Sequence, residues 1–409
     1  MRIARGRRST GRTQRRGRRV VGIAALVLAL IAVPIVGLEI ARIAGDASEQ
    51  PTLAEFYEQP HGAEDGAPGT IVRSAELVGV PALSKAWRIM YRSTDLDGTP
   101  IVVTGIVVTP LGSAPAGGRT VLAWGHPTTG TDPSCAPSRG FDPFIGIEGL
   151  RMMLDRGYTV VATDYAGMGT DGPDSYLVGT TAAHTVLDAV RAAQAIPEAQ
   201  ASDRLVLWGH SQGGQAVLFA AQETPEYAPE FDVLAVAAAA PAADLTALMT
   251  AHADDVSGVT IGSYAFPAFA SVYGPTVAGA ELGDILTPTA VATVPDMNRL
   301  CLLDNLDRLH QMADPLIGDF FAHDPTTTEP WATLLAKNSA GGSPIGAPVF
   351  VAQGADDALI TPDATDAFVS AARAHGDDVS KVTVPFATHA TIAYLSLPAL
   401  EEWLDRHVP

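Results

Sequence analysis

The stretch that decides the fold is Leu205-Val206-Leu207-Trp208-Gly209-His210-Ser211-Gln212-Gly213. Its first four residues are apolar and predict a short buried strand. The segment that follows, Gly213–Glu223, is rich in Ala, Gln and Leu and predicts a helix. Strand, tight turn and helix form the context in which G-x-S-x-G presents a nucleophilic hydroxyl, with glycines that let strand and helix pass close together. Ser211 is therefore the candidate nucleophile; the alternative is a purely structural Gly-Ser turn.

A nucleophilic serine needs a base and an acid that orients the base. Two carboxylates compete for the acid's role in the loop Gln353–Pro362, which follows an apolar predicted strand. In the common form of such a loop, a glycine is followed by a pair of spacers, the acid, a second pair of spacers and a β-branched residue. Counting from Gly354 puts Asp357 in the acid position and Ile360 in the branched one. We predict that Asp357 is the acid and that Asp356 caps the loop or faces solvent.

The candidate base is His389, on a loop between the last predicted strand and a closing helical segment. This placement gives the chain order Ser211, Asp357, His389, which is the order of the triad in α/β-hydrolases. His126 and His210 are the nearest other candidates, and both are interpreted as supports around the turn that carries the serine.

The chain resembles the secretory lipase family of α/β-hydrolases, in its fungal lipase A-like and actinobacterial form. The resemblance covers roughly residues 75–407. Besides the serine turn it rests on Trp124-Gly125-His126-Pro127-Thr128-Thr129-Gly130, Cys135-Ala136-Pro137-Ser138, Val160-Val161-Ala162-Thr163-Asp164-Tyr165-Ala166-Gly167-Met168-Gly169, Gln353–Pro362, and His389 with its closing helix. It implies a mostly parallel central sheet with helices on both faces and an inserted helical lid. It also implies that Ser211, Asp357 and His389 act on carboxylic esters.

Attack of a serine on an ester also needs donors for the tetrahedral oxyanion. The backbone N–H of Gln212 is predicted to be one, because it follows the nucleophile. The second is expected from the loop after the predicted strand Thr120–Trp124. Pro127 has no N–H to give, so the candidates are Thr128 and Thr129. The alternative for this segment is a plain polar turn, and the sequence departs here from the His-Gly-Gly loops of many esterases.

Asp164 and Tyr165 follow the predicted strand Thr159–Thr163 and end at the same edge of the sheet as the serine turn. A functional interpretation makes them a wall of the substrate pocket. The structural interpretation, which we favour, makes Asp164 a loop carboxylate that accepts hydrogen bonds from backbone amides near the turn at 167–169.

The charge of the chain is unevenly distributed. Its 409 residues are 47% hydrophobic and carry a formal net charge of −19. Residues 1–19 contain nine Arg and no acid, so the remainder has 17 basic and 45 acidic residues, a balance of −28. Such an acidic body argues against a nucleic-acid partner. No cofactor motif, metal motif or internal repeat is evident, and we expect neither cofactor nor metal.

The N-terminal region is typical of an exported protein. Residues 20–38 contain no charged side chain, and a helix of that length spans about 28 Å, close to a bilayer core. A basic arm at 1–19 followed by an apolar segment at 20–40 indicates a signal peptide or an uncleaved signal anchor. The Arg excess places the arm in the cytoplasm and the body outside. We therefore expect either a membrane-anchored protein facing outward or a secreted one.

The two cysteines, Cys135 and Cys301, both lie in the exported body. An oxidising compartment permits a disulfide between them, and two cysteines cannot build a zinc site. The family resemblance also implies a bridge from the Cys-Ala-Pro-Ser loop to the lid. The alternative is a pair of buried free thiols.

The rest of the chain divides by pattern. Residues 45–70 are polar and Pro-rich and predict a tether or a wrapping arm. Asp97-Gly98 predicts a hairpin turn. Strands then alternate with helices to about Ala240, which assigns residues 71–241 and 345–409 to an α/β core. The pattern changes between them, and residues 242–344 are predicted to form a lid inserted before the acid loop.

Two further expectations concern the lid. Leucines and a methionine recur at every third position from Met297 to Leu309, which predicts a single helical stripe that packs the lid core or contacts lipid. Aromatic side chains in the insertion either line an acyl tunnel or simply pack the lid; they are Tyr264, Phe266, Phe269, Tyr273, Phe320 and Phe321.

Three functions are compatible with these residues. The leading one is an exported lipase or esterase that hydrolyses acylglycerol-like esters through an acyl-enzyme, with a lipid or ester as substrate. An acyltransferase or a peptidase would use the same triad. A non-catalytic α/β-hydrolase acting as a binding module is the third, and it is disfavoured because all three candidate triad residues are present.

Overall fold

A computed structural model describes residues 53–408. Among these residues, no helix combines the length and the apolar character that a bilayer crossing requires. The basic arm at 1–19 and the apolar segment at 20–40, on which the signal or anchor prediction depends, lie outside the described residues.

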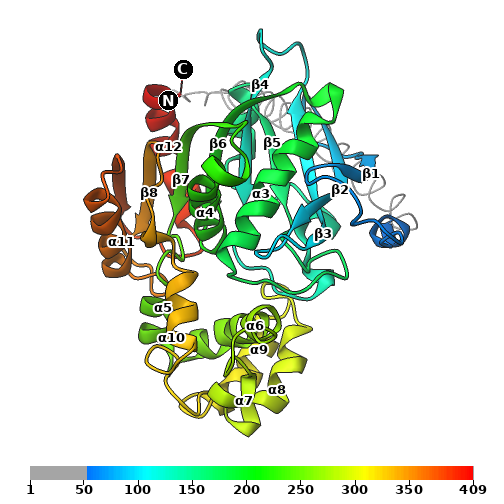
Figure 1. Ribbon diagram of the computed structural model, residues 1–409. Helices are drawn as coiled ribbons and strands as arrows, with labels where there is room; N and C mark the ends of the chain where they lie inside the picture. Colours follow the sequence, from blue (N-terminus) through cyan, green and yellow to red (C-terminus); the bar gives the residue numbers. More distant parts are fainter. Residues whose placement is uncertain (1–52, 409) are drawn as a thin grey trace, which may run out of the picture. The chain divides into compact units, whose positions relative to one another are not determined.

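A nine-stranded sheet forms the centre of the fold, with the strand order β1-β2-β3-β5-β4-β6-β7-β8-β9 (Figure 1). The strands are β1 (Ile71–Glu76), β2 (Ser84–Thr94), β3 (Pro100–Pro110), β4 (Arg119–Gly125), β5 (Thr159–Thr163), β6 (Ala201–His210), β7 (Asp232–Ala239), β8 (Val349–Gly354) and β9 (Val379–Val384). Strands β1 to β3 pair antiparallel, as do β3 and β5, and every pair from β5 through β9 is parallel. The mostly parallel sheet that the sequence predicted is confirmed, and the hairpin at Asp97-Gly98 joins β2 to β3.

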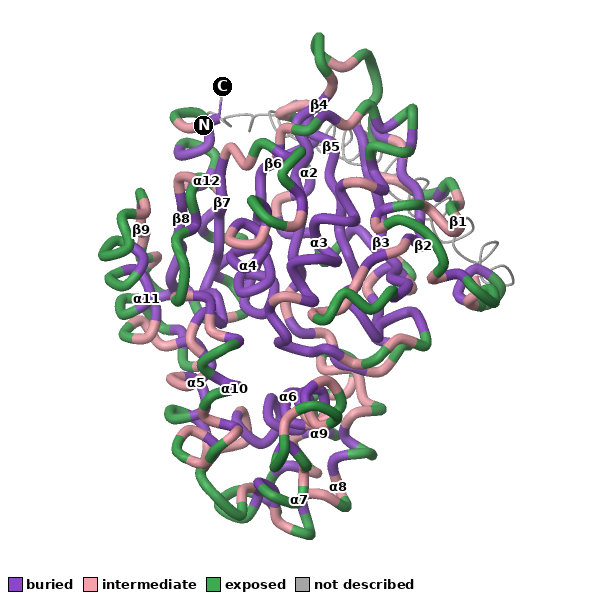
Figure 2. Tube along the Cα trace, viewed as in Figure 1, coloured by how far each residue is buried: buried purple, intermediate pink, exposed green. Residues whose placement is uncertain are grey.

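Helices cover both faces of the sheet, and each face buries its own apolar cluster. The helices of the core are α2 (Leu150–Asp155), α3 (Gly179–Gln194), α4 (Gln212–Tyr227), α11 (Pro362–Ala374) and α12 (Ile392–His407). Helices α3, α4 and α11 pack on one face, and α2 and α12 on the other (Figures 1 and 2). Every residue of β4 and β5 is buried, which explains their near-continuous apolar sequence, because parallel strands covered on both sides have no solvent face.

Between β7 and β8 the chain forms a separate group of helices. They are α5 (Leu245–His252), α6 (Val256–Tyr273), α7 (Leu282–Ile285), α8 (Pro288–Asn298), α9 (Leu306–Ala313) and α10 (Trp331–Lys337). These helices lie beyond the carboxyl ends of the parallel strands (Figure 1), the edge at which α/β proteins bind ligands. The helices fall within residues 242–344, the segment that the sequence assigned to an insertion; below it is called the cap.

The predicted stripe from Met297 to Leu309 is wrong as a single helix. Helix α8 ends at Asn298 and α9 begins at Leu306. Met297 and Leu309 are buried, whereas Leu303 is 74% exposed. The segment between the two helices contains Cys301, which is bridged to Cys135 in another loop.

The cap aromatics pack against one another. Five of the six are buried, and Phe321 is half-buried. Phe266 lies 5.2 Å from Phe321 and 5.3 Å from Trp331 between ring centroids, and Phe269 lies 5.7 Å from Tyr273. In this arrangement they form the core of the cap.

The described part of the Pro-rich N-terminal segment wraps around the edge of the sheet. Residues 53–57 are helical, and Phe56 and Tyr57 are buried in a small cluster with Met90 and Val102. Tyr57 also shares a hydrogen bond with Ser138, 2.5 Å between the hydroxyl oxygens. The segment thus contributes to the core from residue 53 onward.

The disulfide between Cys135 and Cys301 is confirmed. It joins the loop after β4 to the segment between α8 and α9, and the two cysteines are 166 positions apart in the sequence. Beside it, the backbone N–H of Leu302 donates to the carbonyl oxygen of Thr129, at 2.8 Å. The cap is therefore attached covalently and by hydrogen bonding to the loop in which the oxyanion donors were predicted.

Replacing both cysteines by Ala is expected to lower the free energy of unfolding by up to about 5 kcal/mol, the chain-entropy value for so long a loop. Urea unfolding of Cys135→Ala/Cys301→Ala and of the unreduced protein measures the difference. Adding a reductant should bring the natural protein to the stability of the double variant. Equal midpoints in all samples would show that the crosslink contributes no stability.

Candidate active site

Ser211 is the single residue between the end of β6 and the start of α4. Its backbone conformation is unusual, with φ 55° and ψ −116°. Few non-glycine residues adopt a positive φ, and strain of this kind concentrates at functional sites. The turn is held by neighbours on both sides, because the Ser211 N–H donates to the Ala239 carbonyl and the Ser211 carbonyl accepts from Gln215 and Ala242. The predicted strand–turn–helix context of the serine is present.

The glycines of the motif are required by close packing. A Cβ on Gly213 would lie 1.8 Å from the carbonyl oxygen of Gly125 at the end of β4, and one on Gly209 would lie 2.2 Å from the carbonyl oxygen of Gly213. Contacts below about 3 Å are essentially absent for real Cβ atoms. The start of α4 can therefore pack against β4 and β6 only because Gly213 and Gly209 lack side chains.

The structure brings the three predicted residues together. Nε2 of His389 lies 2.9 Å from the Ser211 hydroxyl oxygen, and Nδ1 of His389 lies 2.9 Å from a carboxylate oxygen of Asp357. An ionised carboxylate can only accept, so Nδ1 carries the proton and Nε2 is left to accept from the serine hydroxyl. This is the tautomer that a general base facing Ser211 needs.

Asp357 is buried and its second carboxylate oxygen is also occupied. That oxygen accepts from the backbone N–H groups of Leu359 and Ile360, both at 2.9 Å. The neighbouring Asp356 is exposed and does not contact His389. The side chain of Gln353 steadies the loop by donating to the Ile360 carbonyl and accepting from Thr365. Of the two competing carboxylates, Asp357 is the one that reaches His389.

The candidate oxyanion donors lie at the start of α4 (Gln212) and in the loop after β4 (Thr128 and Thr129). Strand β4 pairs with β6 up to Gly125 and Gly209, so the loop after β4 lies beside Ser211. Within residues 53–408, the backbone N–H groups of Gln212, Thr128 and Thr129 donate to no other residue. Thr128 is buried and its hydroxyl is 2.7 Å from that of Tyr176. The oxyanion role of these three N–H groups stays a prediction.

Asp164 is a structural carboxylate, but its partners differ from those predicted. It accepts from the backbone N–H of Ser138, at 2.9 Å, and from the hydroxyls of Ser138 and Thr104. Burial raises the pKa of its carboxyl, and these hydrogen bonds act in the opposite direction. The amides near 167–169 are not its partners, because the Cys-Ala-Pro-Ser loop folds over it. Tyr165 is buried and donates to the His126 carbonyl.

His126 is buried at the end of β4, and its ring is tilted against that of Tyr165 with 4.4 Å between ring centroids. Nδ1 lies 2.6 Å from the Pro127 carbonyl oxygen, and Nε2 has no partner within residues 53–408. Burial lowers the pKa of His126 to about 4. The ring is therefore neutral at ordinary pH, consistent with a supporting role.

This pKa predicts a loss of stability in acid. Unfolded His126 titrates near 6.5, so between pH 6.5 and 4 the unfolded state binds more protons and the free energy of unfolding falls as pH falls. The contribution of His126 amounts to about 3 kcal/mol over that window. Urea unfolding of His126→Gln at several pH values should give a flatter pH profile than the natural protein, whereas exposed His323→Gln should not. Parallel profiles would contradict the neutral assignment.

Sequence reasoning missed a buried pair behind the base. Nδ1 of His210 lies 3.0 Å from a carboxylate oxygen of Glu148, both side chains are buried, and the His210 ring is 5.0 Å from that of His389. His210 was predicted to support the serine turn, and it does pack there. Glu148 gave no signal, because it lies in an irregular loop far from the motif along the chain.

A second missed residue, His252, links the cap to the acid loop. Its Nδ1 lies 2.6 Å from a carboxylate oxygen of Asp255, and its Nε2 lies 2.9 Å from the carbonyl oxygen of Leu359. Asp255 also caps the N-terminus of α6 through Ser257 and Gly258. The N–H of Leu359 donates to Asp357. Two hydrogen bonds, one on each side of Leu359, therefore connect His252 to the predicted acid.

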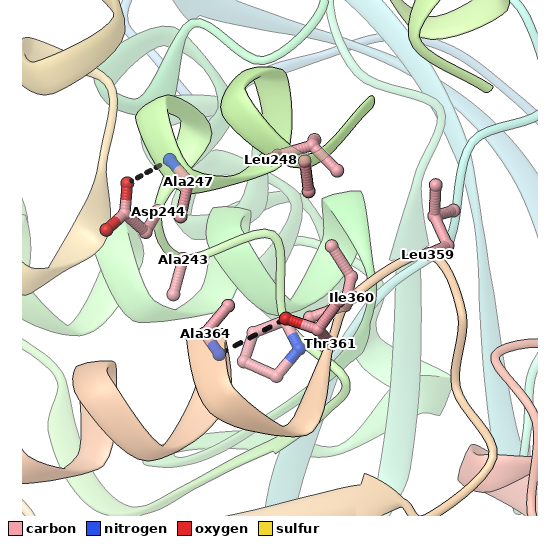
Figure 3. A pocket seen from close by; sticks show the side chains of 10 residues that line it. Ala243, Asp244, Ala247, Leu248, Leu359, Ile360, Thr361 and Ala364 are labelled. Atoms are coloured by element: carbon pink, nitrogen blue, oxygen red, sulfur yellow. Dashed lines mark hydrogen bonds between the residues drawn. The ribbon is translucent and has the colours of Figure 1, made fainter. Parts of the chain in front are cut away.

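A small pocket lies beside this link, between α5 and the start of α11 (Figure 3). Its walls include Ala243, Ala247, Leu248, Leu359 and Ile360. None of Ser211, Asp357 and His389 lines it. The pocket lies between the cap and the acid loop, which the His252–Leu359 hydrogen bond connects. In the described part of the chain, no group of three or more His, Cys, Asp or Glu is suited to a metal ion.

Comparison with known proteins identifies the family. The family model for secretory lipases matches residues 145–408. The chain belongs to the secretory lipase family. That membership assigns it to the carboxylic ester hydrolases, and a secretory family fits an exported protein.

Relatives of this secretory lipase differ in what their names say. A Mycobacterium tuberculosis protein named probable inactive lipase is 25% identical over 87% of this chain and 81% of its own length. Lipase 4 of Candida albicans is 30% identical over 44% of this chain. The chain spans 42% of that relative's length.

Solved structures agree with the fold. Candida antarctica lipase A in its closed state has a TM-score of 0.70 with 17% identity, covering 87% of this chain and 86% of that chain. The rice cell wall degrading esterase LipA from Xanthomonas oryzae has a TM-score of 0.68 with 20% identity, covering 84% and 99%. These neighbours confirm the α/β-hydrolase fold.

Proposed function

We propose that this secretory lipase is an active, exported serine esterase or lipase in which Ser211, His389 and Asp357 form the catalytic triad. The observation that carries the proposal is the unbroken hydrogen-bonded chain from Asp357 through His389 to Ser211, with 2.9 Å at each link. A binding module that had lost catalysis would have no need to keep this geometry.

The proposed reaction proceeds in two halves. His389 takes the proton of the Ser211 hydroxyl as the oxygen attacks the ester carbonyl, and Asp357 stabilises the imidazolium. The oxyanion is bound by the N–H of Gln212 and by that of Thr128 or Thr129. His389 then protonates the leaving alcohol, and an acyl-enzyme on Ser211 remains. Water, deprotonated by His389, releases the acid and restores the serine.

The cap is proposed to act as a lid. Ser211 is buried, so an ester reaches its hydroxyl only when part of the surroundings moves. The cap contacts the loop after β4 through Leu302, and Tyr264 of α6 packs 5.8 Å from Tyr176 between ring centroids. The Tyr176 hydroxyl shares a hydrogen bond with the Thr128 hydroxyl. Movement of the cap would therefore change access to the proposed oxyanion site.

His252 is proposed to be a positioning residue for the acid loop. The change His252→Phe keeps a ring but removes the bond to the Leu359 carbonyl, and a hydrogen bond of this kind contributes about 1 kcal/mol. We expect kcat on a soluble ester to fall about fivefold with little change in KM. In the control Asp255→Asn, His252 can still donate to Leu359, and kcat should stay near the natural value. An equal loss of kcat in both variants would contradict the positioning role.

A panel of p-nitrophenyl esters from short to long acyl chains tests the proposed function. We expect hydrolysis of at least one ester. Incorporation of labelled water oxygen into the released acid distinguishes hydrolysis from acyl transfer to another acceptor. Absence of turnover with every ester, in protein that is folded and has its disulfide, would refute the proposal.

A further inference from the structure

The segment that carries His389 forms an uncharged surface on an acidic protein. From Val382 to Leu400 there is no Asp, Glu, Lys or Arg, although the chain has a net charge of −19. Large apolar side chains on this segment face solvent, since Phe386 is 86%, Tyr394 47% and Leu395 52% exposed. They lie on both sides of His389 in the sequence, so the surface adjoins the proposed active site.

A second segment extends this surface. The hydroxyl of Tyr394 donates to the carbonyl of Ile145, at 3.0 Å, which places the start of α12 against the loop before α2. In that loop Ile145 is 73% and Phe141 51% exposed. Because Asp142 directly follows Phe141, we leave Phe141 out and call the exposed side chains of Ile145, Phe386, Tyr394 and Leu395 the His-loop surface.

The backbone of Phe386 is notable because its φ is 60°. A bulky residue is disfavoured there, and glycine would adopt the same turn more easily. The ring gains almost no burial in return, because most of its area is open to solvent. Leu83 combines a φ of 61° with 70% exposure in the same way, so what sets Phe386 apart is the uncharged sequence around it and its place beside His389.

Other exposed apolar residues do not form a comparable surface. On the cap, Leu303 and Leu306 are exposed, but Asp304 and Asp307 follow them directly. Leu83 and Leu111 are 70% and 54% exposed at the start of β2 and the end of β3. Because β3 runs antiparallel to β5, that pair lies at the opposite edge of the sheet from Ser211 and provides a matched control.

We propose that the His-loop surface docks the protein onto the uncharged surface of an aggregated ester lipid. This inference rests on the proposed function, because the lipid is the substrate of the same site. Removing exposed apolar rings from water favours insertion into a lipid interface. The apolar side chains of this surface need no counter-charge in their partner. The exposed Asp356, whose backbone N–H donates to the Ala387 carbonyl, and the balance of −28 beyond the N-terminal arm disfavour an anionic membrane.

Site-specific fluorescence tests the docking without requiring catalysis. In the full chain carrying Ser211→Ala, Phe386→Trp places a probe on the surface and Leu83→Trp places one at the opposite edge. The five natural Trp residues are all buried and give a constant background. Vesicles of phosphatidylcholine brominated in the acyl chains should quench the probe at 386 and leave the probe at 83 unquenched. Phosphatidylglycerol vesicles should quench position 386 less.

The outcomes separate the alternatives. Vesicle-bound protein with no quenching at 386, or equal quenching at both positions, overturns the proposal; a segment elsewhere in the chain would affect both probes alike. If Phe386→Ser converts a dimer to a monomer in sedimentation, the surface binds a second copy, and the lipid assignment is overturned. These results hold even if the natural protein proves inactive, so they are distinguishable from failure of the proposed function.

Kinetics give a second readout in protein with Ser211 intact. For Phe386→Ser/Tyr394→Ser we expect the rate on emulsified tributyrin to fall about tenfold, because interfacial binding scales with buried apolar area. Hydrolysis of dissolved p-nitrophenyl acetate should change by less than about twofold, as for most surface substitutions. Leu83→Ser should alter neither rate. Equal losses on both substrates would contradict docking.

Discussion

Ser211→Ala is expected to abolish ester hydrolysis, with kcat falling by about 10⁴-fold or more. Alanine offers no oxygen for acyl transfer, so His389 loses the group whose proton it accepts. The fold should be retained, because the strained turn is held by backbone bonds to Ala239, Gln215 and Ala242 rather than by the hydroxyl. Rates with the best ester of the panel, together with thermal unfolding, measure the effect.

The control for this change is Ser370→Ala, on the exposed side of α11. It should leave the rate within about twofold of the natural value, as for most surface positions. A residual rate in Ser211→Ala above that of water alone is also expected, since oxyanion donors and substrate binding act without the nucleophile. Undiminished activity in Ser211→Ala would refute its assignment as nucleophile.

Asp357→Asn should lower kcat by about 10⁴-fold. An amide in place of the carboxylate presents a donor as well as an acceptor, so the His389 tautomer with its proton on Nδ1 is no longer enforced and the imidazolium loses its counter-charge. The same change at Asp356 should have less than about a twofold effect, because that side chain is exposed.

The pair of variants decides between adjacent carboxylates under identical assay conditions. Both proteins lose one negative charge, so a general electrostatic effect would appear in both. A large loss of activity in Asp356→Asn with normal activity in Asp357→Asn would show that Asp356, and not Asp357, is the acid that orients His389.

The predictions that succeeded are those for which local sequence and chain order carry the information. The serine turn needs glycine at Gly209 and Gly213 whatever surrounds it, so its pattern is visible in one short stretch. The acid and the base follow separate parallel strands, and the carboxyl ends of parallel strands meet at one edge. Order along the chain therefore predicted that Asp357 and His389 would lie near Ser211.

The features that escaped prediction depend on contacts between distant segments. The stripe from Met297 to Leu309 has a helical period, but the chain leaves the helix between α8 and α9, where Cys301 is bridged to a distant loop. Asp164 was expected to bind nearby amides, and its partner is Ser138 in a loop that folds back over it. Glu148 and His252 lie in irregular segments or at a helix end, where no periodic signal indicates which polar groups will meet.

The central claim is that the hydrogen-bonded arrangement of Ser211, His389 and Asp357 activates the serine. It is tested most directly by reacting the folded protein with a fluorophosphonate and mapping the adduct by mass spectrometry. The account predicts one phosphonyl group, located on Ser211, formed rapidly in the natural protein and much more slowly in His389→Gln. No adduct, or an adduct on another residue while Ser211 remains unmodified, would contradict the account.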